Sequence, residues 1–291
     1  MSSNGLTIEK RIKNQLLINS LSIAHQMLEG NDCLVMHINI DGLKLNYIDE
    51  GKGSTVLLLH GWGGSIQTMK PIANILKDKC RIISLDLPGF GESDQPKEPW
   101  NSYDYAQCIK KFIDSLGVDD IILFGHSHGG RISIILSSKY NFVKKLILID
   151  SAGIIPKRKL KYYIRVYSFK LLKSIYTMFS KGDIREKKLE EFYKKFGSAD
   201  YKASQGVMRQ TMVKVINDNL VELLPSIKAP TLLIWGENDE DTPLYMGKLM
   251  EEKISDSGLI ILKGAGHYSY IDCYDQFKAV INVFLKDEFN Y

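Results

Sequence analysis

Apolar and polar residues alternate over two segments, 35–40 and 43–49, which are separated by Asp41-Gly42. Alternation with a period of two is typical of a strand with one buried face, and Asp-Gly between two such runs is a strong hairpin signal. The apolar run that follows at 55–60 is too short for a helix and indicates a strand buried on both faces. The pattern therefore predicts a hairpin followed by an interior strand.

Beyond this point, short apolar runs alternate with longer segments of helical periodicity. The runs predict strands at 81–86, 121–125, 144–149, 231–235 and 259–262. The longer segments predict helices at 66–77, 102–116, 129–139, 244–254 and 274–286. Alternating strands and helices form a mostly parallel sheet with helices on both faces. We therefore expect an α/β fold whose sheet, with the hairpin included, has eight strands.

Two stretches do not follow this alternation. Residues 1–34 precede the first strand, and helical spacing over 7–29 predicts an N-terminal helical extension. Residues 152–228 are helical in pattern, basic and aromatic, with no clear strand. They interrupt a core domain that we assign to 35–151 and 229–291. We interpret 152–228 as a helical lid inserted between two strands of that core.

The composition is ordinary for a globular protein, with 44% hydrophobic and 25% charged residues among 291. No run of about 18 apolar residues occurs, so we expect no membrane span. The four cysteines are scattered without a CxxC pair, which argues against a disulfide framework and against a zinc site. Because no clear signal peptide precedes the fold, we predict a cytoplasmic protein.

The net charge of +4 is unevenly distributed. Residues 156–195 contain 13 Lys or Arg and 4 Asp or Glu, a balance of +9, which leaves about −5 for the rest of the chain. We interpret this basic stretch as the solvated face of lid helices. Two alternatives stay open, namely peripheral contact with anionic lipid or a partner, and attraction of anionic substrates. We expect no nucleic-acid partner, and the oligomeric state is left open.

Candidate chemistry begins at Gly125-His-Ser-His-Gly129, which matches G-x-S-x-G. A predicted strand precedes the motif and a predicted helix follows it. A sharp strand-to-helix turn exposes the serine hydroxyl and makes Ser127 the candidate nucleophile. The alternative is that Ser127 only caps the helix.

A serine hydroxyl needs a base, and the base needs an acid that orients it. The order nucleophile, acid, histidine accompanies this type of elbow, and His267 alone among the six histidines satisfies it. Asp239 follows the strand predicted at 231–235 and is our choice of acid. Asp241 and Asp150 are its rivals.

Acyl transfer also needs donors for the developing oxyanion. The residue after the nucleophile, His128, offers one backbone N–H group, and Trp62 in His60-Gly-Trp-Gly-Gly64 offers a second. Two glycines after Trp62 allow that loop to approach a substrate closely. The alternative is that His60–Gly64 is only a tight turn.

Together these motifs resemble the α/β-hydrolase superfamily, in the right order and over roughly residues 35–286. They are His60-Gly-Trp-Gly-Gly64, Asp86-Leu-Pro-Gly-Phe-Gly-Glu-Ser93, Gly125-His-Ser-His-Gly-Gly130, Gly236-Glu-Asn-Asp239 and Gly264-Ala-Gly-His267. The resemblance is closest to esterases and meta-cleavage-product hydrolases. It implies a turn with a structural role at Asp86–Ser93. The chain departs from the family at His128, where methionine or glutamine is common, and at Tyr268, where carbon–carbon hydrolases often carry tryptophan.

The resemblance implies a serine hydrolase that cleaves a carboxylic ester of a small acyl substrate, without a metal or a cofactor. Ser127 excludes the chemistries of the family that use an aspartate nucleophile. Cleavage of a carbon–carbon or amide bond by the same triad is the first alternative, and a ligand receptor with little turnover is the second. Arg209 and Tyr268 are candidate substrate contacts, although a surface position is the favoured interpretation of Arg209.

Overall fold

The computed structural model describes residues 35–157 and 204–289, together with a few residues between 167 and 191. The helix predicted at 7–29 and most of the lid predicted at 152–228 lie outside the described residues. Both stay predictions, as do the domain boundaries drawn around them.

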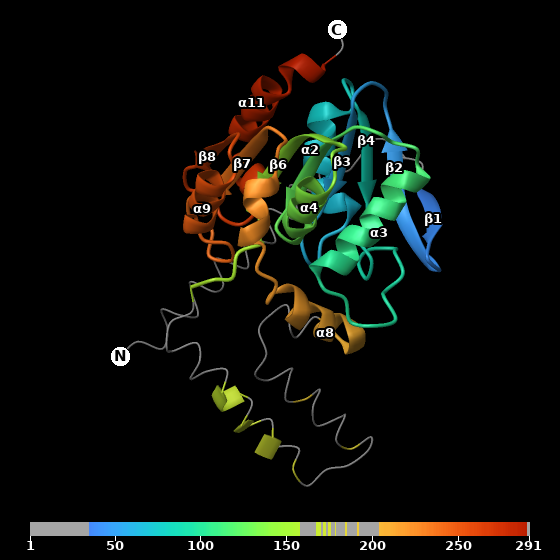
Figure 1. The fold of residues 1–291 in the computed structure, drawn as a ribbon, viewed down its shortest axis with the longest axis vertical. Coiled ribbons are helices and arrows are strands. Elements are labelled where there is room, and N and C mark those ends of the chain that lie inside the picture. Colours follow the sequence, from blue (N-terminus) through green and yellow to red (C-terminus); the bar gives the residue numbers. More distant parts are fainter. Residues whose placement is uncertain are drawn as a thin grey trace.

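One sheet of eight strands organises the chain (Figure 1). Its strands are β1 (Met36–Ile40), β2 (Leu43–Glu50), β3 (Thr55–Leu59), β4 (Arg81–Leu85), β5 (Ile121–His126), β6 (Val143–Ile149), β7 (Thr231–Gly236) and β8 (Ser257–Leu262). They lie in the order β1-β2-β4-β3-β5-β6-β7-β8. β2 is antiparallel to both β1 and β4, and every other pairing is parallel. The predicted fold class is therefore confirmed.

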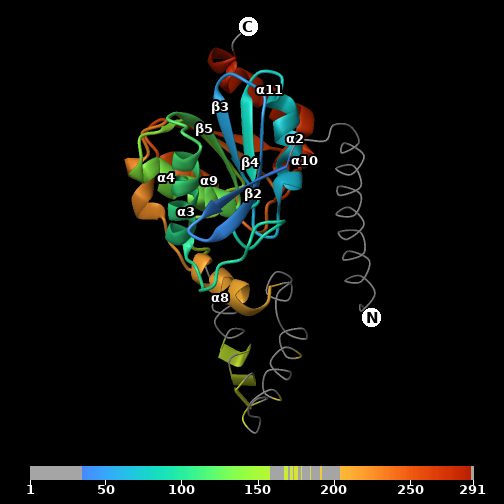
Figure 2. The ribbon, with the colours of Figure 1, turned by 90° about the vertical axis from the view of Figure 1, so that its right-hand side faces the viewer.

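Helices cover both faces of the sheet, as Figure 2 shows nearly edge-on. The larger apolar core holds buried side chains of α3 (Ser102–Ser115), α4 (His128–Lys139) and α9 (Tyr245–Lys253). The second core, on the opposite face, holds those of α2 (Ile66–Leu76) and α11 (Tyr274–Phe284). Because both faces are buried, the central strands are mainly apolar, as the five residues from Leu232 to Gly236 show.

The predicted strands and core helices are all present, and their ends differ from the predictions by at most two residues. In the hairpin, Asp41 and Gly42 both have positive φ, at 51° and 83°, which is the geometry a two-residue Asp-Gly turn requires. Four elements had not been predicted individually: α8 (Gly206–Val215), η1 (Val221–Ser226), α10 (Ser269–Asp272) and η2 (Lys286–Glu288). Each is short, so each offers little periodicity to detect.

The parallel strands place the chemistry of the chain at one edge of the sheet. Because β3, β5, β7 and β8 run in the same direction, the loops after their carboxyl ends meet there. These loops contain four of the motifs singled out above. A ligand site is therefore expected at this edge, as in other open parallel sheets.

Two further findings bear on the predicted surroundings of the protein. None of the helices in the described part of the chain combines the length and the apolar character that crossing a membrane requires. Cys80, Cys108 and Cys273 are free thiols. The cytoplasmic location stays a prediction.

Candidate active site

Ser127 occupies a strained turn between β5 and α4. Its φ of 49° and ψ of −109° are unusual for a residue with a side chain. The turn is possible because Gly129 packs directly on the backbone carbonyl of Leu59, where a Cβ atom would collide. Ser127 lies at the N-terminus of α4, but its side chain makes no capping hydrogen bond. The alternative role of Ser127 as a helix cap is therefore wrong.

Three polar side chains from three loops are joined by hydrogen bonds at this turn. Oγ of Ser127 lies 2.9 Å from Nε2 of His267. Nδ1 of the same imidazole lies 2.8 Å from Oδ2 of Asp239. His267 is 140 positions from Ser127 and 28 positions from Asp239 in the chain, so the fold of the sheet brings the three residues together. The arrangement can transfer a proton from the hydroxyl to an imidazole that a carboxylate orients.

Asp239 is built to stay ionised next to His267. Its Oδ1 accepts hydrogen bonds from the backbone N–H groups of Asp241 and Thr242, and its Oδ2 accepts one from the Thr242 hydroxyl at 2.7 Å. Burial opposes ionisation of Asp239, but the hydrogen bonds from His267 and Thr242 outweigh burial and hold the pKa of the carboxyl below its ordinary value. Burial likewise opposes protonation of His267, but the hydrogen bond and charge of Asp239 raise its pKa above 6.5.

The two rival acids do not hydrogen-bond to His267. The carboxylate of Asp150 is fully buried and accepts the backbone N–H groups of Gly236 at 2.7 Å and Ser269 at 3.0 Å. Burial raises the pKa of Asp150 to about 7, although these hydrogen bonds oppose the rise. Asp150 thus links the loop after β7 to the loop that carries His267. Asp241 donates its backbone N–H group to Asp239, while its side chain is exposed and borders the pocket.

The loop after β3 is held by His60. The Nδ1–H group of His60 donates to the Gly61 carbonyl at 2.7 Å, and its Nε2 accepts the Leu87 N–H group at 2.9 Å. Burial lowers the pKa of His60 to about 4, so the ring is neutral and keeps both contacts. The backbone N–H groups of Trp62, in this loop, and of His128, directly after Ser127, have no acceptor among the described residues. Both are available to a ligand oxygen.

His126 contacts both the backbone and the ring of His267. Its Nε2 lies 2.9 Å from the carbonyl oxygen of His267, and the two rings are 5.0 Å apart between centroids. Burial lowers the pKa of His126 to about 3, so the neutral ring donates its Nε2–H group to that carbonyl. The Tyr268 ring also lies 5.0 Å from His126. The sequence motif had suggested no contact between His126 and the base.

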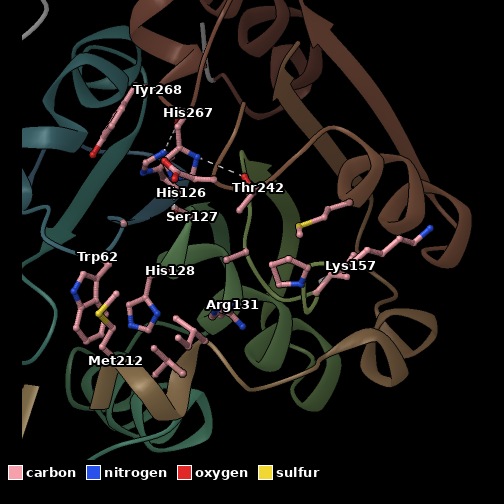
Figure 3. Close-up of a pocket in the computed structure, with 18 residues that line it drawn as sticks. Trp62, His126, Ser127, His128, Arg131, Lys157, Met212, Thr242, His267 and Tyr268 are labelled. Atoms are coloured by element: carbon pink, nitrogen blue, oxygen red, sulfur yellow. Dashed lines mark hydrogen bonds between the residues drawn. The ribbon is translucent and has the colours of Figure 1, made fainter. Parts of the chain in front are cut away.

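A cavity of about 640 Å³ opens in front of Ser127 (Figure 3). Tyr268 and Trp62 border it, as does Lys157. Helix α8 contributes Met212 and Val215. Arg209, predicted as a substrate contact, is buried one turn earlier on α8 and is not among the described residues that line this cavity. The guanidinium that does line it belongs to Arg131, which sequence reasoning missed.

Among the described residues, one group of side chains has the composition of a cation site: Asp239, Asp241 and His267, whose potential ligand atoms lie within 4.8 Å of one another. However, both ring nitrogens of His267 already take part in hydrogen bonds, to Ser127 and Asp239. A metal bound to this histidine would have to displace one of them. The geometry therefore fits proton transfer better than metal coordination.

Comparison with known proteins agrees with the fold and the motifs. The model of the alpha/beta hydrolase fold family matches residues 54–273, which is most of the chain. Lipase 1 of Psychrobacter immobilis is 27% identical over 293 residues, with 92% of this chain and 83% of the lipase covered. The 2-hydroxy-6-oxononadienedioate/2-hydroxy-6-oxononatrienedioate hydrolase of Escherichia coli (strain K12) is 28% identical over 269 residues, with 84% of this chain and 91% of that enzyme covered.

Among solved structures, a bacterial membrane phospholipase A has the same fold, with a TM-score of 0.69 and 22% sequence identity. The match covers 97% of each chain. The sheet order, the strained serine turn and the matched family model lead to one conclusion. The chain belongs to the α/β-hydrolase fold family and is a hydrolase of that family.

Proposed function

We propose that the protein is a serine hydrolase that cleaves a carboxylic ester through an acyl-enzyme. In this proposal Ser127 is the nucleophile, His267 the general base and Asp239 the acid that orients the base. The observation that carries the proposal is the continuous pair of hydrogen bonds, 2.9 Å and 2.8 Å long, from the serine hydroxyl through the imidazole to the carboxylate. It ends at a cavity large enough for a small-molecule substrate.

The reaction begins when Nε2 of His267 accepts the hydroxyl proton and Oγ of Ser127 forms a bond to the ester carbonyl carbon. The carbonyl electron pair moves to oxygen. When this pair returns, the bond to the alcohol oxygen breaks, and the protonated His267 gives its proton to the leaving alcohol. Water then attacks the acyl-enzyme by the same steps, releasing the acid and restoring the Ser127 hydroxyl.

The transient negative charge needs two donors, and we assign them to the backbone N–H groups of Trp62 and His128. Their lack of acceptors among the described residues supports this assignment. The hydrogen bonds of His60 support it further, because they fix the loop that presents Trp62. Donors held in place before the reaction lower the barrier without reorganisation, by about 3 kcal/mol for a single donor.

We also propose that residues 152–228 form the lid of this site. Described residues at both ends of the stretch border the cavity, including Ile154 and Pro156 at one end and Met212 and Ile216 at the other. A lid placed there would exclude water and select the acyl group.

A fluorophosphonate probe combined with a substrate panel tests the proposal. We expect the probe to label Ser127 once per chain, as identified by peptide mass spectrometry, and p-nitrophenyl esters to be hydrolysed in preference to anilides. The panel includes a dienedioate ketone, because the Escherichia coli relative is named for that substrate. Labelling with turnover of the ketone but not of the esters would replace the ester assignment by carbon–carbon cleavage. Absence of labelling would overturn the serine mechanism.

The pH profile is expected to carry the signature of a raised histidine pKa. His267 must be neutral to accept the serine proton, so activity is lost as the pH falls through its pKa. Because Asp239 raises that pKa above 6.5, the acid limb of kcat/KM should have its midpoint above 6.5. This midpoint is measured from initial rates of hydrolysis of a neutral ester between about pH 5 and about pH 9. A midpoint well below that of an ordinary histidine would contradict the assigned pair.

A further inference from the structure

Two buried polar side chains on the cavity wall make few hydrogen bonds or none to the described residues. His128 is 3% exposed, and neither nitrogen of its ring has a hydrogen-bond partner among the described residues. Arg131 is 6% exposed, and the contact found for its guanidinium in the same part of the chain is one hydrogen bond, from Nη1 to the Asp218 carbonyl at 3.0 Å. Buried polar groups are paired in the great majority of cases. An unpaired ring in the wall of a cavity therefore points to a ligand.

Both side chains lie on one face of α4, next to the nucleophile. They are three positions apart, and residues at that spacing lie on the same side of a helix. Both line the cavity in front of Ser127, and Figure 3 shows them close together. The rings of Tyr105 and Trp62 pack edge-to-face on the His128 imidazole, with centroids 4.8 Å and 5.4 Å away. These rings keep bulk water from His128.

The charge on this wall is positive. Burial lowers the pKa of Arg131 to about 10, so the guanidinium remains charged at neutral pH. Burial also lowers the pKa of His128 well below 6.5, so its neutral ring offers one N–H donor. The carboxylate of Asp218 lies nearby, but its Oδ2 accepts the Ser102 backbone N–H group. Lys157 adds a second cation to the cavity lining, and Asp241 is the acidic side chain that borders it among the described residues.

The position of this wall relative to the base indicates which part of a substrate it meets. The leaving alcohol must lie near Nε2 of His267, which protonates it. Figure 3 shows Ser127 between His267 and the side of the cavity formed by His128 and Arg131. A substrate that reacts with Ser127 therefore directs its acyl chain toward these two residues.

We propose that His128 and Arg131 form a carboxylate site for the far end of the acyl group, so that the enzyme prefers monoesters of dicarboxylic acids. The inference rests on the proposed serine hydrolase function and narrows its substrate class. A carboxylate is planar and accepts several hydrogen bonds, which suits a guanidinium and an imidazole N–H group. A plain hydrocarbon chain would leave the His128 ring without a partner and would add nothing to the one hydrogen bond that Arg131 makes to the Asp218 carbonyl, so it would be bound less well.

The test compares two esters that differ in one charge. The mono-p-nitrophenyl ester of adipate and p-nitrophenyl hexanoate have acyl chains of equal carbon number. We expect wild-type kcat/KM, corrected for spontaneous hydrolysis, to be roughly ten- to hundredfold higher for the anionic ester, as a charge-assisted hydrogen bond implies. The Arg131→Gln variant should lose this ratio, and Arg131→Lys should keep part of it. Lys144→Met is the matched control, because it removes one positive charge from an exposed position and should leave the ratio intact.

A wild-type ratio of one or less with both adipate and glutarate monoesters would overturn the proposal, as would an Arg131→Gln variant with an undiminished ratio. Circular dichroism establishes whether that variant is folded, and if it is not, the wild-type and Arg131→Lys ratios decide. If the enzyme shows neither turnover nor fluorophosphonate labelling, the proposed serine hydrolase function has failed, and the ester comparison does not test the carboxylate site. In that case calorimetry of Ser127→Ala with monomethyl adipate against dimethyl adipate decides the carboxylate site: selective binding of the anion supports it, and equal or absent binding overturns it.

Discussion

Replacement of Ser127 by alanine is expected to lower kcat by roughly 10⁶-fold, the loss typical when the nucleophile of such a triad is removed. The reason is that no other hydroxyl in the described structure is hydrogen-bonded to Nε2 of His267. The fold should survive, because the Ser127 side chain makes no helix-capping bond. Loss of activity is measured by burst kinetics with a p-nitrophenyl ester and by fluorophosphonate labelling. Survival of the fold is measured by a thermal unfolding curve.

Ser138→Ala is the matched control for this variant. Ser138 lies on the same helix, and its hydroxyl donates to the Ile135 carbonyl at 3.0 Å rather than to the site. The Ser138→Ala variant should therefore keep wild-type activity and wild-type labelling by the fluorophosphonate probe. A Ser127→Ala enzyme that retains more than a few per cent of wild-type kcat, or still reacts with the probe, would rule Ser127 out as the nucleophile.

Replacement of Asp239 by asparagine should lower kcat by roughly 10³- to 10⁴-fold. The amide group would present an N–H donor to Nδ1 of His267, which would then have to accept, so that the imidazole proton moves to Nε2. In this tautomer Nε2 cannot take the proton of Ser127. Loss of the negative charge should also lower the pKa of His267, because Asp239 is what raises it. The residual activity should therefore show its acid limb at a lower pH than the wild type.

The Asp241→Asn variant distinguishes the role of the Asp241 carboxylate from that of Asp239. Asp241 contacts Asp239 through its backbone N–H group, which the substitution preserves, and its carboxylate is exposed. We expect its loss of kcat to stay within about tenfold, as for an exposed charge. The measurement is the pH dependence of kcat for both variants and the wild type. If Asp241→Asn shows the larger loss, the acid is Asp241 and the assignment to Asp239 is wrong.

The backbone frame could be predicted from the sequence because its signals are local. Apolar runs of five or six residues, the Asp41-Gly42 turn and the helical segments between strands each identify their own element. Strand direction then follows from the alternation, and parallel strands bring their carboxyl ends to one edge. This is why Ser127, Asp239 and His267 could be expected near one another, although long stretches of chain separate them.

The positions of His128 and Arg131 on the cavity wall, and the contacts that support the triad, could not be predicted in the same way. Arg131 reads in the sequence as one more residue of the helix after the serine, and its burial depends on the loop that carries Asp218. Asp150 was a rival acid because it ends a strand, whereas its carboxylate is occupied by the backbone of two other loops. Such roles depend on which groups are left unpaired after folding, and that is a property of three-dimensional contacts rather than of spacing.

The backbone angle at position 127 has a consequence for how this chain could evolve. A residue with a side chain held at a φ of 49° costs on the order of 1–3 kcal/mol, whereas glycine adopts such angles freely. Selection for durability alone would therefore favour glycine there. In a lineage that no longer needed the reaction, replacement of Ser127 by glycine would be tolerated and would increase the free energy of unfolding. Glycine at this position in a related sequence would therefore indicate that the protein had lost its hydrolase activity and kept its fold.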